Sequence, residues 1–143
     1  MFQTTPLMRR LLALMLLTCA TWATAQDFPN RPIRLVVPYG PGGVTDINAR
    51  TLATRLGEIL GQSVVVDNRA GGASIVGSDA VAKAKPYGYT LLLTSTALAA
   101  NHILFKKIPY DPVKDLMPVS FVSTVPTVLV VHNNVPAQNL KEL

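Results

Sequence analysis

Three short apolar runs, each followed by a loop of glycines or hydroxyl residues and then by a helix-forming segment, constrain this chain most strongly. The runs lie at 33–39, 63–68 and 90–95 and are rich in Val, Leu and Ile. Strands that alternate with helices in this way form parallel sheets with right-handed crossovers. The sequence therefore predicts an α/β fold, a three-layer sandwich in which the first strand lies between the other two.

Helices are predicted after each run. In the first, apolar side chains recur at helical spacing, and Gly61 is expected to end it: Ala49, Leu52, Ala53, Leu56, Ile59 and Leu60. Thr45 or Asp46 is expected to cap this helix, and Asp46 to pair with Arg50 one turn on. Two further helices are predicted at 74–84 and 96–105.

The pattern changes after residue 108. Prolines punctuate residues 108–118, and two extended runs follow at 119–125 and 127–132, separated by Pro126. A helix is predicted to begin near Pro136. Because the chain stops at Leu143 inside this starting helix, we interpret it as the N-terminal piece of something longer, a truncated form.

The first 25 residues have the features of a secretory signal peptide. Arg9 and Arg10 precede a short apolar run at 11–23, and the small residues Ala23 and Ala25 suit cleavage after Ala25. Cys19, the one cysteine of the 143 residues, leaves a lipid anchor open as an alternative. The chain carries 13 basic and 8 acidic residues, and the basic ones are scattered, so nucleic-acid binding is not expected.

The three loops that follow the strands are suited to binding rather than to catalysis. In a parallel sheet they share one edge, where the N–H groups and positive ends of helices face a ligand. Glycines in the first two loops and the hydroxyls of 94–96 add donors for an anion. No nucleophile–base pair is evident, and His102 and His132 stand too far apart in the sequence to suggest a metal site.

An ordered set of motifs at 39–46, 67–77, 80–83, 88–93, 110–112 and 118–120 resembles the Bug family, the extracytoplasmic solute-binding receptors of tripartite tricarboxylate transporters. The resemblance implies a monomeric periplasmic receptor of two lobes, a Venus flytrap of the type II-like class, without cofactor or metal. It would trap a small carboxylate and deliver it to the membrane components of the transporter. Residues 26–118 would form the first, incomplete lobe, and 119–143 the hinge crossing, at Pro126, and the start of the second lobe.

The same resemblance implies the ligand-binding residues, carried over by position from the three loops: Tyr39, Gly42, Gly43, Thr45, Asp46, Ala73, Ser74, Thr94 and Ser95. A carboxylate such as Asp46 does not itself attract a carboxylate ligand, so we expect it to cap the helix or to accept from a water or a ligand amine. The second loop departs from the family's commoner glycine pattern at Ala73 and Ser74.

Two other functions are open. Gly40 and Gly42 after the first strand, with Asp67 at the end of the second, imitate the fingerprint of a nucleotide-binding Rossmann-like enzyme. Against it, the third glycine of that fingerprint is replaced by Thr45, and Pro41 removes a backbone donor. The remaining alternative is a non-binding fragment with only a structural role.

Overall fold

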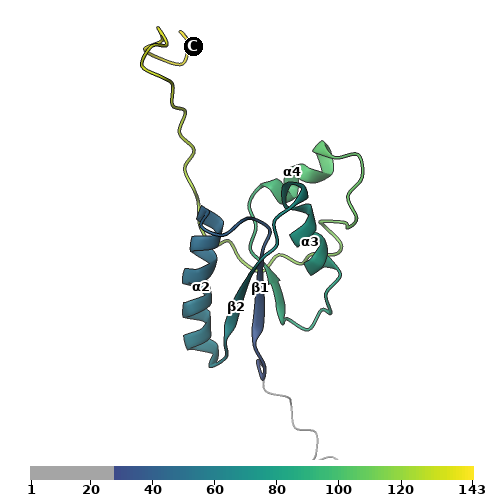
Figure 1. Ribbon diagram of the computed structural model, residues 1–143. Coiled ribbons are helices and arrows are strands. Elements are labelled where there is room, and N and C mark those ends of the chain that lie inside the picture. The colour runs from purple at the N-terminus through teal and green to yellow at the C-terminus, as the bar shows by residue number, and fades with distance from the viewer. Residues whose placement is uncertain (1–27) are drawn as a thin grey trace, which may run out of the picture.

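The computed structural model describes residues 28–143, so the predicted signal peptide lies outside the described residues. The elements follow in the order β1 (Ile33–Val37), α2 (Val44–Leu60), β2 (Val64–Asn68), the 3₁₀ turn η2 (Gly72–Ser74), α3 (Ile75–Ala82), β3 (Thr90–Leu92) and α4 (Ala97–Leu104). Figure 1 shows α2 on one side of the strands, with α3 and α4 on the other. The predicted three-layer α/β arrangement is confirmed.

The three strands form one parallel sheet in the order β2-β1-β3. Leu35 of β1 is aligned with Val66 on one side and with Leu91 on the other. The first strand is therefore central, as the short crossovers predict. β1 ends at Val37, two residues earlier than predicted, because Pro38 has no N–H to donate to a ladder. β3 is also shorter than predicted, although the Leu93 N–H still reaches the Val36 carbonyl at 2.9 Å.

The core lies between the sheet and α2. Leu35 and Val37 are fully buried there against Ala49 and Ala53. On the opposite face α3 approaches the chain closely, since a Cβ placed on Gly77 would lie 2.7 Å from the Cβ of Pro38. Small residues on both helices thus set how closely the layers pack.

The ends of the helices correct part of the prediction. The N-cap of α2 is Gly43, and no side chain caps it, so the expected cap by Thr45 or Asp46 is wrong: both lie within the first turn. Gly61 ends α2 in the left-handed conformation, φ 63°, as predicted. α3 begins at Ile75 because the preceding turn is left-handed, and it ends at Ala82.

Within the described residues, the segment after α4 holds no helix or strand. The helix predicted near Pro136 is replaced by turns, such as the bond from the Glu142 N–H to the Asn139 carbonyl, because Leu140 is exposed and no packed face stabilises a helix there. Residues 119–132 lead away from the α/β body (Figure 1), with Phe121 and Val130 each 80% exposed. No described helix is long and apolar enough to cross a membrane.

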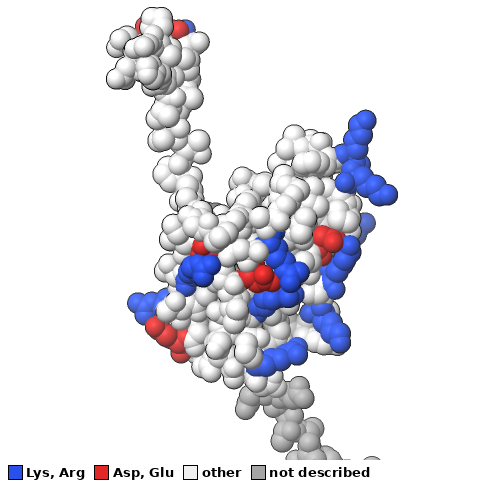
Figure 2. Space-filling model, viewed as in Figure 1, with Lys and Arg blue, Asp and Glu red and all other residues white. Residues whose placement is uncertain are grey.

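Charge is spread unevenly between the α/β body and the segment that follows it from residue 119. On the face in Figure 2, basic side chains are distributed over the whole α/β body, with acidic groups between them. The segment that leads away from the body is uncharged along most of its length. One hydrogen bond, from Asn48 Nδ2 to Ser123 Oγ at 3.1 Å, joins its beginning to α2.

Candidate functional site

The loops that leave the three strands meet at one edge of the sheet, because all three strands are parallel. They are residues 38–43 before α2, 69–74 before α3 and 93–96 before α4. Figure 1 shows these turns gathered at the end of the sheet where α2 begins. The structure thus brings all nine predicted site residues to this edge, five of them in two hydrogen-bonded clusters.

The first cluster consists of hydroxyl groups around Tyr39. Its phenol oxygen is hydrogen-bonded to Ser95 Oγ at 2.7 Å and lies 3.5 Å from Thr94 Oγ1. Burial alone would raise the pKa of Tyr39, but the hydrogen bonds with Ser95 and then Thr94 outweigh it and lower the pKa. Ser95 Oγ also accepts from the Ala97 N–H at 3.3 Å, so the cluster reaches the first turn of α4.

The second loop is held by Asn101, a residue that the sequence did not point to. Asn101 Nδ2 donates to the Ala73 carbonyl at 2.7 Å and to Ser74 Oγ at 3.1 Å. Asn101 and Ser74 are both buried. The available signal was a single amide in a helix whose other residues, apart from His102, are apolar, since a buried amide requires partners.

The backbone of this loop is strained. Four successive residues have positive φ, and two of them are not glycine: Gly71 at 139°, Gly72 at 54°, Ala73 at 52° and Ser74 at 78°. A non-glycine residue in this region costs on the order of 1–3 kcal/mol and persists only where the surroundings impose it. Asn101 supplies part of that constraint, and strain of this kind concentrates at ligand sites.

The second cluster is centred on the buried carboxylate of Asp46. Its oxygens accept from Arg50 Nε at 3.0 Å, from the Gly42 N–H at 2.8 Å and from Asn68 Nδ2 at 3.0 Å. These bonds, that of Arg50 first, lower the pKa of Asp46 to about 2. The predicted pair of Asp46 with Arg50 is confirmed, whereas Asn68 was not predicted as a site residue.

The start of α2 supplies free donors beside this cluster. Helices leave their first N–H groups without an intrahelical partner. Within residues 28–143, no hydrogen bond is formed by the N–H groups of Gly43, Val44 or Thr45, while Gly42 has given its N–H to Asp46. Gly43 and Val44 are exposed, and Thr45 is half-buried. An anion at this edge would meet these groups and the hydroxyl cluster.

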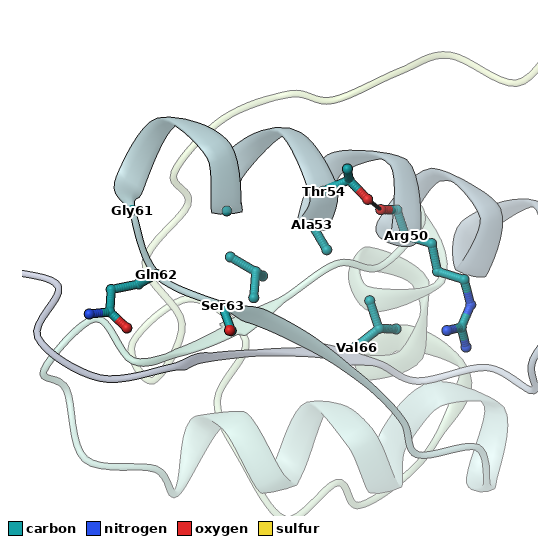
Figure 3. A pocket seen from close by; sticks show the side chains of 9 residues that line it. Arg50, Ala53, Thr54, Gly61, Gln62, Ser63 and Val66 are labelled. Atoms are coloured by element: carbon teal, nitrogen blue, oxygen red, sulfur yellow. Dashed lines mark hydrogen bonds between the residues drawn. The ribbon is translucent and has the colours of Figure 1, made fainter.

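A hollow of about 630 Å³ lies elsewhere, between α2 and the edge strand β2 (Figure 3). Its lining shares only Arg50 with the second cluster, and Figure 3 places Arg50 at the end opposite Gly61 and Gln62. The hollow therefore extends away from the loops. No group of three or more metal-ligating side chains is found among residues 28–143.

The chain is similar in sequence to known proteins. Residues 48–143 match the family model described as the tripartite tricarboxylate transporter family receptor. The chain is similar to BugT of Bordetella pertussis, with 46% identity over 143 aligned residues that cover 95% of this chain and 44% of BugT.

Two solved structures resemble it as well. Rpa4515 of R. palustris, described with adipate, is 38% identical with a TM-score of 0.73, over 81% of this chain and 39% of that one. MatC of Rhodopseudomonas palustris, described with bound malate, is 34% identical with a TM-score of 0.70, over 80% and 40% of the two chains. The chain therefore spans less than half the length of these relatives.

Proposed function

The chain belongs to the tripartite tricarboxylate transporter receptor family, and we propose that it supplies the first lobe of a receptor that captures a small carboxylate. In this assignment residues 26–118 form the lobe, and residues 119–143 cross by way of Pro126 toward a second one. The family is one of receptors, so the chain binds its ligand and does not convert it.

The observation that carries the proposal is the convergence of donors at the carboxyl edge of the sheet. The hydroxyls of Tyr39, Thr94 and Ser95 and the N–H groups at the start of α2 all lie in loops that leave the carboxyl ends of the parallel strands. Hydrogen-bond donors of this kind suit a carboxylate, which only accepts. The positive end of the α2 dipole favours the same charge.

The relatives indicate the ligand class. Rpa4515 and MatC are described with adipate and with malate, which are both dicarboxylates. We therefore propose a small di- or tricarboxylate for this site. Three of the predicted site residues contribute to the site without direct side-chain contact with the ligand. Gly42 and Ala73 act through the backbone, and Asp46 acts through the residues to which it is bonded.

Location and partners follow from the same assignment. We propose that residues 1–25 direct export and are removed after Ala25. The receptor would then work as a monomer in the periplasm, together with the membrane components of a tripartite transporter. Intact-mass analysis of periplasmic material tests the export step: a mature chain that begins at Gln26 is expected, and an uncut chain or a lipid on Cys19 would contradict it.

Isothermal titration of residues 26–143 tests ligand capture. Each charge-assisted hydrogen bond contributes roughly 1.5–3 kcal/mol, and less in the open, while lost ligand freedom costs about 4 kcal/mol or more. One lobe alone should therefore bind adipate or malate at millimolar strength. A linear diamine of equal length is the control. Equal heats for the diamine would contradict a carboxylate site, and micromolar affinity would contradict the need for a second lobe.

A further inference from the structure

Asp46 occupies a position at which a ligand contact was expected, yet the chain itself satisfies its carboxylate. Oδ1 accepts from Asn68, and Oδ2 accepts from Gly42 and Arg50. Asp46 is only 2% exposed, so a ligand cannot reach these oxygens. The carboxylate therefore acts on the loop around it.

We propose that Asp46 is a positioning residue of the carboxylate site: it withholds the Gly42 N–H and fixes the loop so that the N–H groups of Gly43, Val44 and Thr45 face the ligand. This inference rests on the proposed function. Gly42 has φ 84°, which turns the chain into α2, and its bond to Asp46 closes that turn at 2.8 Å.

Asn68 extends the same network to the neighbouring strand. Its Nδ2 donates both to Asp46 Oδ1 at 3.0 Å and to the Tyr39 carbonyl at 3.1 Å, and its Oδ1 accepts from Arg50 Nη2 at 3.2 Å. The end of β2, the exit of β1 and the first turn of α2 are thus joined by side chains that all bond to one another. A loop held at both Tyr39 and Gly42 keeps its donors aligned before the ligand arrives.

The charge of Asp46 makes this role testable by the sign of an effect. A negative group beside an anion site opposes binding, so simple removal of the charge should strengthen it. Removal of the carboxylate also frees the Gly42 N–H, an added donor that again favours the anion, but it releases the loop, which should weaken binding. Because Arg50 already neutralises the charge at 3.0 Å, we expect release of the loop to dominate.

Nitrogen-15 NMR of residues 26–143 measures both effects, with malate as the probe. In Asp46→Ala the hydrogen exchange of the Gly42 amide should rise at least about tenfold, and malate affinity should fall by about tenfold, in keeping with the loss of one charge-assisted bond. Asp46→Asn keeps an acceptor oxygen, so it should retain much of the protection of the Gly42 amide and much of the affinity for malate. Asp79→Ala is the matched control, since Asp79 is an acidic helix residue that forms an i,i+4 pair with Lys83 and no hydrogen bond with Gly42 or Asn68.

Three outcomes decide the inference. Unchanged exchange at Gly42 in Asp46→Ala would overturn it, and so would malate affinity equal to or higher than that of the wild type. Equal effects of Asp46→Ala and Asp46→Asn would assign the role to charge alone and also overturn it. If the wild type does not bind malate, the proposed function fails, and Gly42 exchange still decides the positioning role. If Asp46→Ala does not fold, Asn68→Ala replaces it and must raise the hydrogen exchange of the Gly42 amide.

Discussion

Gly77 of α3 lies against Pro38 at the end of β1, so closely that an added Cβ would be 2.7 Å from the Pro38 Cβ and 2.9 Å from the Arg69 carbonyl oxygen. Two of the three exit loops therefore meet at this helix. The contact sets the distance between the sheet and α3, and with it the position of the strained turn that precedes α3.

Gly77→Ala should destabilise the fold by about 1–3 kcal/mol, because the extra methyl group overpacks this contact. Gly57→Ala is the matched control, since Gly57 is also within a helix and its added Cβ would be 3.4 Å from the Gln62 carbonyl oxygen. That variant should be neutral or should gain about 0.5–1 kcal/mol from helix propensity. Urea unfolding of both variants checks the prediction, and equal stabilities would contradict it.

Asn101→Ala should cost about 1–3 kcal/mol, because it leaves the Ala73 carbonyl and the Ser74 hydroxyl without their buried donor. His102→Ala, an exposed neighbour on the same helix, should stay within about 0.5 kcal/mol of the wild type. Thermal unfolding of the two variants measures the difference. A loss for His102→Ala as large as that for Asn101→Ala would show that helix α4, rather than the amide, is responsible.

Much of the fold could be predicted from the sequence, because local patterns encode it. Strand order, the end of α2 at Gly61 and the pair of Asp46 with Arg50 follow from periodicity, glycine chemistry and i,i+4 spacing. The family assignment is confirmed as well, and membership of a receptor family rules out the nucleotide-binding enzyme.

The site could be predicted only in outline. Asn68 and Asn101 bond to residues 22 and 28 positions away, and no local spacing signals such a contact. The side chain of Asp46 is buried because it bonds to Asn68 as well as to Gly42. Since Asn68 is distant in the sequence, the position of Asp46 in the first helical turn suggested a cap instead. Residues 119–143 were assigned extended and helical structure from composition, but no neighbouring strand pairs with them among the described residues.

Ala73→Gly should stabilise the chain by about 1 kcal/mol, because glycine adopts φ 52° without the penalty that a Cβ brings. Ala100→Gly, within α4, should instead destabilise it by about 1 kcal/mol. Chemical unfolding distinguishes the two. Destabilisation by Ala73→Gly would contradict the strain assigned to this turn.

The pH dependence of stability should reflect Asp46. Its pKa is lowered from 3.8 to about 2 in the folded chain, so the stability it adds is present above pH 4 and is lost as the pH falls toward 2. The difference in unfolding midpoint between the wild type and Asp46→Asn should therefore shrink between pH 5 and pH 2. A difference that stays constant over this range would contradict the network around Asp46.

Whether the strand-exit loops form the carboxylate site is tested most directly by a map of where a dicarboxylate binds. Residues 26–143, labelled with nitrogen-15, would be titrated with adipate and with the matched diamine. Adipate-specific shifts are expected at the backbone amides of 43–45, 73–74 and 94–96, with little change around the hollow between α2 and β2. Shifts centred on Gly61, Gln62 and Ser63 in that hollow, or equal shifts with the diamine, would contradict a carboxylate site at these loops.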